Sequence, residues 1–112
     1  MKKIEAIIRP TKLDEVRHAL EEAGCAGITV TEVEGHGKQK GVVQQWRGKE
    51  YKVELLSKIK VEIVVKDAEV DRIVKTIIEV GKTGDIGDGK IFVYPVENAY
   101  KIRTGENGES AI

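Results

Sequence analysis

The sequence predicts one α+β domain in which a strand–helix–strand unit occurs twice. Three observations support this fold class. Apolar and polar residues alternate in three short segments, apolar residues recur every three or four positions within each half, and both halves repeat the same order. The 112 residues are enough for one hydrophobic core and too few for two. This order favours a four-stranded antiparallel sheet with both helices on one face.

The first half is predicted to form a strand, a helix and a second strand. The alternation over 4–8 indicates a strand, which Pro10 ends. Thr11 is expected to cap the helix and Gly24 to end it. The segment 28–34, rich in Thr and Val, is the second strand. The residues expected on the buried side of the helix are Leu13, Val16, Ala19, Leu20 and Ala23.

The second half repeats this plan. Apolar and polar residues alternate over 59–65, which predicts a third strand. Asp67 is expected to cap the second helix and Gly81 to end it. The segment 91–96 is expected to form the fourth strand. The apolar positions of the helix are Val70, Ile73, Val74, Ile77 and Ile78. Two such units form the split βαβ arrangement of ferredoxin-like folds.

One face of the predicted sheet has no helix to cover it. We infer that a homo-oligomer covers this face, because monomers rarely expose a large apolar patch. The alternative is that charged neighbours such as Glu5 and Glu62 suffice to solvate it. The apolar residues expected there are Ile7, Val33, Val64 and either Phe92 or Tyr94.

A connection of unusual length, 35–56, separates the second and third strands. Its central part, 38–54, holds five basic and two acidic side chains. Trp46, Arg47 and Tyr51 belong to residue types enriched in interface hot spots. We therefore interpret the segment as a docking arm; an insertion without a role is the alternative.

A glycine-rich segment precedes the fourth strand. Gly84, Gly89 and Lys90 fit the pattern G-x-x-x-x-G-K, but Ile91 stands where a P-loop has Ser or Thr, and a strand follows in place of a helix. Glycines still allow backbone N–H groups to face an anion, and Lys90 adds a positive charge. The segment indicates phosphate binding outside the P-loop fold; a plain turn is the alternative.

The composition argues against several classes of protein. Lys+Arg and Asp+Glu both number 19, which disfavours general nucleic-acid binding. An RNA-recognition domain needs aromatic residues on one sheet face, whereas Phe92 and Tyr94 are expected on opposite faces. Cys25 is the only cysteine, so no intrachain disulfide forms. No apolar run suggests a membrane span or a signal peptide, and a cytoplasmic location is expected.

Two segments resemble a known family. WRGKEY at 46–51 resembles the Y-R-G-x-E-Y signature of the PII nitrogen-regulatory signal proteins, and 83–93 resembles their second signature. The segments 1–8 and 102–106 are also similar, so the resemblance covers the chain. It implies a single PII-type domain over 1–112. Within that domain lie a T-loop at about 37–55, a glycine-rich phosphate loop at about 82–90 and a C-terminal segment at about 101–112.

The resemblance also implies a function. PII proteins are trimers that bind ATP or ADP between subunits, bind 2-oxoglutarate only with Mg-ATP, and have no primary catalytic role. Their T-loop docks onto ammonium channels, nucleotidyl-transferring enzymes, and in some lineages a sensor kinase or an arginine-pathway kinase. The protein is therefore expected to be a nitrogen, carbon and energy sensor, recruited to the membrane through an ammonium channel. The alternative is a small nucleotide-hydrolysing enzyme, although no carboxylate–histidine pair or hydroxyl nucleophile is expected near the loop.

The site residues follow by position from the resemblance. The nucleotide-binding residues that it implies are Thr29, Gly37, Lys38, Glu62, Val64, Gly87, Asp88, Gly89, Lys90, Lys101 and Arg103. The 2-oxoglutarate-binding residues are Gln39, Gly41 and Lys58, with Gln39 also a ligand of Mg²⁺. The partner-binding residues are Trp46, Arg47 and Tyr51, of which Tyr51 matches a tyrosine that some members have uridylylated or adenylylated.

Overall fold

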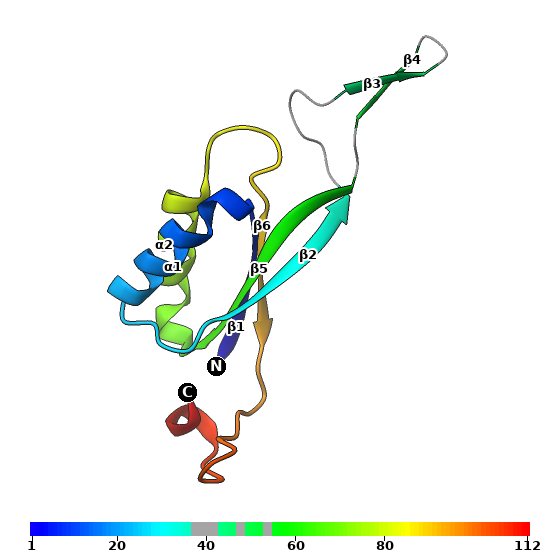
Figure 1. The fold of residues 1–112 in the computed structure, drawn as a ribbon. Helices are drawn as coiled ribbons and strands as arrows, with labels where there is room; N and C mark the ends of the chain where they lie inside the picture. Colours follow the sequence, from blue (N-terminus) through cyan, green and yellow to red (C-terminus); the bar gives the residue numbers. More distant parts are fainter. Residues whose placement is uncertain (37–42, 47–48, 53–54) are drawn as a thin grey trace.

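The computed structural model describes residues 1–36, 43–46, 49–52 and 55–112, with side chains outside 43–52. A four-stranded antiparallel sheet has the order β2-β5-β1-β6, and two helices cover one of its faces (Figure 1). The strands are β1 Lys2–Ile8, β2 Thr29–His36, β5 Leu55–Val65 and β6 Lys90–Pro95, and the helices are α1 Leu13–Glu22 and α2 Val70–Gly81. The predicted ferredoxin-like fold is confirmed.

Two strands pair more extensively than predicted. The ladder between β2 and β5 runs from Thr29↔Glu62 to His36↔Leu55, so β5 begins four residues before the predicted 59–65. The connection between them is correspondingly shorter than 35–56. Within it, β3 Val43–Trp46 and β4 Lys49–Lys52 form a separate two-stranded antiparallel sheet.

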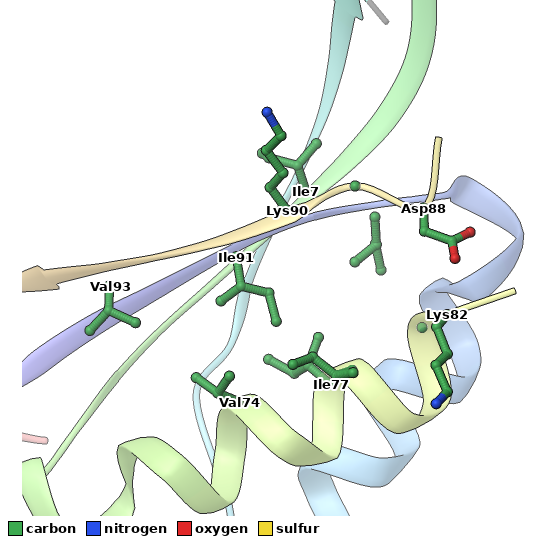
Figure 2. A pocket seen from close by; sticks show the side chains of 12 residues that line it. Ile7, Val74, Ile77, Lys82, Asp88, Lys90, Ile91 and Val93 are labelled. Atoms are coloured by element: carbon green, nitrogen blue, oxygen red, sulfur yellow. The ribbon is translucent and has the colours of Figure 1, made fainter. Parts of the chain in front are cut away.

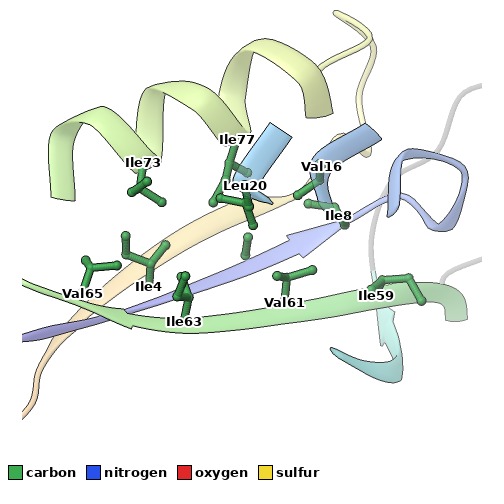
Figure 3. Close-up of a cluster of buried hydrophobic side chains, with 11 residues drawn as sticks. Ile4, Ile8, Val16, Leu20, Ile59, Val61, Ile63, Val65, Ile73 and Ile77 are labelled. Atoms are coloured by element: carbon green, nitrogen blue, oxygen red, sulfur yellow. The ribbon is translucent and has the colours of Figure 1, made fainter. Parts of the chain in front are cut away.

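The core lies between the sheet and the two helices (Figure 3). Alternate residues of β1 and β5 point toward the helices, because successive side chains of a strand face opposite sides. Burial of each large apolar side chain contributes about 1.5–3 kcal/mol. The buried residues are Ile4, Ala6, Ile8, Val16, Leu20, Ile59, Val61, Ile63, Val65, Ile73 and Ile77.

The predicted helix caps are wrong. A 3₁₀ turn, Pro10–Lys12, precedes α1, and Asp67–Glu69 precedes α2, so Thr11 and Asp67 lie inside these turns. Neither α-helix has a side-chain hydrogen bond at its N-cap. The Asp67 carboxylate instead pairs with the N-terminal amino group of Met1 at 3.0 Å, which lowers its pKa.

The predicted helix ends are confirmed, but the buried stripe of α2 is narrower than expected. Gly24 follows α1 with φ +87°, and Gly81 is the buried last residue of α2. Ile78 is 48% exposed, whereas Ile73 and Ile77 are buried. A single sheet covers only one side of a helix, so Ile78 lies at the edge of the contact.

The outer face of the sheet, opposite the helices, carries charged residues at its centre. Lys3 pairs with Glu62 at 3.1 Å, and Lys60 lies 3.9 Å from Glu5. The Tyr94 hydroxyl donates to Glu5 at 2.7 Å. The expected carboxylates therefore have partners on this face.

The prediction that Phe92 and Tyr94 lie on opposite faces is wrong. Phe92 is opposite Glu5 and Tyr94 opposite Lys3 in the β1–β6 ladder, and residues two apart on a strand share a face. Both aromatic residues lie on the outer face and are more than 40% exposed. Ile7, Val33 and Val64 are part-buried.

The C-terminal segment folds back on itself beside the N-terminus (Figure 1). Lys101 N–H donates to the Glu106 carbonyl at 2.8 Å, and Gly105 N–H donates to the Lys101 carbonyl at 2.7 Å. A final 3₁₀ turn, Gly108–Ala111, follows. Val96 N–H donates to the Met1 carbonyl, which holds this segment at the lower end of the sheet.

Candidate functional site

A cavity of about 550 Å³ opens on the outer face at the end of the sheet where β2 meets the predicted arm. We name it the loop cavity. It forms where β1 and β2 end and β5 and β6 begin, so four strand ends and the glycine-rich loop (residues 82–90) surround it. Its lining residues are Ile7, Gly35, His36, Leu56, Lys58, Asp85, Ile86, Gly87, Asp88, Gly89, Lys90 and Phe92.

Asp88 organises the loop from within. Its Oδ2 accepts hydrogen bonds from the backbone N–H of Thr83 at 2.8 Å and of Gly84 at 2.9 Å. Its Oδ1 accepts from Thr83 Oγ1 at 2.5 Å and from Arg9 Nε at 2.9 Å. The Thr83 hydroxyl and the Arg9 guanidinium, with the two backbone groups, hold the pKa of Asp88 well below its usual range.

Arg9 joins the loop to the end of β1. While its Nε contacts Asp88, its Nη2 donates to the carbonyl of Ile86 at 3.0 Å. The Arg9 side chain is 17% exposed and that of Asp88 23% exposed. One guanidinium therefore fixes the residues on both sides of Gly87.

Two glycines of the loop have backbone conformations that other residues rarely adopt. Gly87 and Gly89 both have φ +102°. At Gly89 the space is closed as well, because an added Cβ would lie 1.7 Å from the Ile7 carbonyl oxygen. The loop backbone therefore passes so close to β1 that position 89 has no room for a Cβ atom.

Lys58 reaches the loop from β5. Its Nζ donates to the Gly87 carbonyl at 2.5 Å. Burial lowers the pKa of this ammonium group, with Arg9 contributing in the same direction. A cation that is partly desolvated and close to a second cation favours an anion beside it.

Lys90 lies on the opposite rim. Figure 2 shows Lys90 pointing away from α2, whereas Ile91 and Val93 point toward it. A second cavity, of about 380 Å³, lies on that helix side and shares Ile7, Asp88, Gly89 and Lys90 with the loop cavity. The remainder of that second lining is chiefly aliphatic, so polar groups converge on the outer side.

Three of the expected nucleotide-binding residues lie elsewhere. Thr29, Glu62 and Val64 line a different cavity of about 430 Å³, which we name the tail cavity because Ala111 and Ile112 also line it. Thr29 is opposite Glu62 in the ladder. Along β1, Ile7 of the loop cavity and Lys3 of the tail cavity are four residues apart, or about 13 Å. The contacts of Glu5 with Lys60 and with the Tyr94 hydroxyl lie between them.

The structure therefore divides the expected ligand residues into groups. The first group consists of Lys58 and the loop residues. The second consists of Thr29, Glu62 and Val64. The third, in the C-terminal segment, consists of Lys101 and Arg103. Lys101 lies 3.9 Å from Glu106, and Arg103 is exposed. Trp46 lies in β3 and Tyr51 in β4, two strands for which the structure describes the backbone. Gly37, Lys38, Gln39, Gly41 and Arg47 lie outside the described residues.

Sequence reasoning missed the roles of Arg9 and Thr83. The signal for Arg9 was its place directly after a strand, which puts its side chain at the sheet end where the loop returns. Thr83 followed by Gly84, with Asp88 four residues on, is a pattern that suits a carboxylate closing a turn.

Comparisons with known proteins agree with this architecture. A family model described as Nitrogen regulatory protein P-II matches residues 1–106. The chain is 56% identical to Nitrogen regulatory protein P-II 2 of Methanothermobacter thermautotrophicus, covering all of this chain and 97% of that protein. It is 59% identical to Nitrogen regulatory protein P-II of Microchaete diplosiphon and 58% identical to that of Rhodospirillum rubrum, with both chains covered in full.

The chain belongs to the P-II family of nitrogen regulatory proteins. Its function is accordingly nitrogen-status signal transduction, and its relatives are named as regulatory proteins. Within the described residues, none of the helices has the length and apolar character needed to cross a membrane.

Proposed function

We propose that the protein senses energy and carbon status by binding ATP or ADP, and 2-oxoglutarate together with Mg-ATP, and that it signals through the arm at 37–55. The observation that carries this proposal is the lining of the loop cavity. Gly35, His36 and Leu56, at the base of the arm, line the same cavity as the glycine-rich loop. A ligand held there contacts both the phosphate-binding loop and the two ends of the arm.

The chemistry of the loop cavity supports an anionic ligand. Lys58 and Lys90 line it from two strands, and Arg9 lies behind the loop. Positive-φ glycines allow successive backbone N–H groups to turn toward an anion. Phosphate groups suit this combination of fixed cations and backbone donors.

A homotrimer completes the nucleotide site in this proposal. In one chain the tail cavity is about 13 Å along the sheet from the loop cavity, and the paired side chains of Glu5, Lys60 and Tyr94 stand between them. If a second copy places its tail cavity against the first copy's loop cavity, both sets of residues meet without that barrier. Repetition of such a head-to-tail contact closes a ring, and the exposed Phe92 and Tyr94 support burial of the outer face.

The other expected ligand residues take their proposed roles from their positions in the P-II family pattern. In this proposal Lys38, Lys101 and Arg103 add charge around the phosphates, and the Gln39 side-chain oxygen binds Mg²⁺, which completes its octahedron with phosphate oxygens. Lys58 pairs with a carboxylate of 2-oxoglutarate, near Gly41. The protein has no primary catalytic role.

Calorimetry of 2-oxoglutarate with Mg-ATP, with Mg-ADP and without nucleotide tests the sensor function. Binding only with Mg-ATP is the expected result, because the metal and the nucleotide form part of the site. Equal binding in all three conditions, or in none, contradicts the composite site. Sedimentation of the same sample tests the trimer separately.

The arm is proposed to dock onto an ammonium channel, a nucleotidyl-transferring enzyme or a kinase, with Trp46, Arg47 and Tyr51 in contact and Tyr51 available for uridylylation or adenylylation. Arg47→Ala should abolish capture of a cognate channel and leave nucleotide affinity unchanged. Lys49→Ala, two residues away, is the matched control. Capture of the channel by Arg47→Ala would rule out this contact.

A further inference from the structure

The carboxylate of Asp88 has no acceptor capacity left for a ligand. An ionised carboxylate offers about four lone-pair sites. Each of its oxygens accepts two hydrogen bonds, from Thr83 N–H and Gly84 N–H at Oδ2, and from Thr83 Oγ1 and Arg9 Nε at Oδ1. A ribose hydroxyl or a metal ion could bind only after one of these bonds breaks.

Arg9 contacts the loop at two points that flank a single residue. Nε binds the Asp88 carboxylate and Nη2 binds the Ile86 carbonyl, so Gly87 lies between two anchored neighbours. From the other side, Lys58 holds the Gly87 carbonyl. With its carbonyl and both neighbours fixed, the peptide groups around Gly87 have few directions open to them.

We propose that Arg9 and Asp88 are positioning residues for the glycine-rich loop, and that the Asp88 carboxylate is not a ligand of nucleotide or metal. The proposal rests on the proposed nucleotide binding and deepens it. Arg9 acts through Asp88 and the Ile86 carbonyl to orient the backbone at Gly87 and Gly89 toward a phosphate. Asp88, which position alone had placed among the nucleotide ligands, faces the turn of its own loop.

The planar guanidinium allows Arg9 to make this two-point contact. Arg presents donors in a rigid fork that can reach two acceptors at once, whereas the ammonium of Lys is a point charge. Arg9→Lys therefore keeps the charge behind the loop and loses the two-point contact. If Arg9 acted only as a charge, lysine would replace it.

The test is calorimetry of ATP, ADP and AMP with four variants of the full-length protein: Arg9→Lys, Arg9→Gln, Asp88→Asn, and the double variant Arg9→Gln/Asp88→Asn. Each single variant should lower ATP affinity about tenfold or more, the size seen when a group that orients a ligand is removed. The loss should shrink from ATP to AMP, because the loop is proposed to bind phosphates. A loss of general stability would lower all three affinities alike.

Non-additivity identifies action through a shared contact. The double variant should lose clearly less than the sum of the two single losses, because the two residues share one contact, and the Mg²⁺ dependence of ATP binding should be unchanged in Asp88→Asn. Wild-type affinity in Arg9→Lys, additive losses, or a new Mg²⁺ dependence in Asp88→Asn would each overturn the proposal. Arg17→Gln is the control, since Arg17 is an exposed arginine of α1 paired with Asp14.

A measurement without ligand separates this proposal from the proposed function. Amide hydrogen exchange at Thr83 and Gly84 should be at least about tenfold faster in Asp88→Asn and in Arg9→Lys than in the wild type and Arg17→Gln. Unchanged exchange overturns the positioning role even if nucleotide binds. Failure of the wild type to bind nucleotide, with exchange altered as expected, overturns the proposed function alone.

Discussion

The ammonium group of Lys58 donates a 2.5 Å hydrogen bond to the carbonyl oxygen of Gly87, which joins β5 to the glycine-rich loop. This charge is therefore directed at a backbone carbonyl. An anion entering the loop cavity competes with that carbonyl for the same ammonium group. Binding of a carboxylate to Lys58 would change a contact of the loop itself.

Lys58→Met should abolish 2-oxoglutarate binding, because the charge is lost, and retain ATP binding, because Arg9 still holds Ile86 and Asp88 on both sides of Gly87. Calorimetry with saturating Mg-ATP measures the loss. Lys66→Met, at an exposed position just after β5, is the matched control and should bind both ligands as the wild type does. Unchanged 2-oxoglutarate affinity in Lys58→Met would remove Lys58 from the site.

Gly89→Ala should destabilise the fold far more than Gly84→Ala. Both glycines have positive φ, which costs an alanine about 1–2 kcal/mol. Only at Gly89 does the new Cβ also collide with a backbone atom, the Ile7 carbonyl oxygen; at Gly84 nothing lies within 4 Å. Urea unfolding of the two variants compares these costs, and equal destabilisation would mean that the loop moves away from β1 freely.

The ionised Asp88 carboxylate should make the free energy of unfolding depend on pH in the acidic range. Its pKa in the folded state lies below the unfolded value of about 3.9, so its contribution is present above that value and is lost as the pH falls toward the folded pKa. The free energy of unfolding, measured between pH 7 and pH 3, should fall less steeply in Asp88→Asn than in the wild type. Asp14→Asn, at an exposed site on α1, should retain the wild-type slope.

Ile73→Ala and Ile78→Ala test the observed edge of the core on α2. Ile73 is fully buried, and its truncation should cost about 2–5 kcal/mol. Ile78 is 48% exposed, so its truncation should cost less than about 1.5 kcal/mol. Chemical denaturation measures both values, and a large cost at Ile78 would show that a partner copy or ligand covers it.

Periodicity predicted the architecture because burial repeats regularly along strands and helices. The two strands of the core and the helical stripe of Val16, Leu20, Ile73 and Ile77 follow directly from it. The errors lie where local geometry overrides the pattern. Thr11 and Asp67 were expected as caps, but an extra 3₁₀ turn moved each helix start, and no periodicity reports such a turn.

The site was predictable only in part, for a related reason. The glycine pattern located the loop, since positive φ needs glycine. The partners of Asp88 could not be found this way, because Arg9 lies 79 positions away in sequence and reaches it only when β1 and β6 pair. Contacts between distant segments depend on the register in which the strands pair, and the pattern of apolar residues does not predict that register.

The pairing of β2 with β5 as far as His36↔Leu55 has a consequence for replacing the arm. Both ends of the arm leave the sheet side by side, so its excision leaves a gap that a short turn can close, and doubling the length of an insertion there costs only about 0.6 kcal/mol. The segment 37–54 can therefore behave as an exchangeable cassette. If the arm selects partners as proposed, grafting another arm would change partner choice, while Gly35 and Leu56 stay in the lining of the loop cavity.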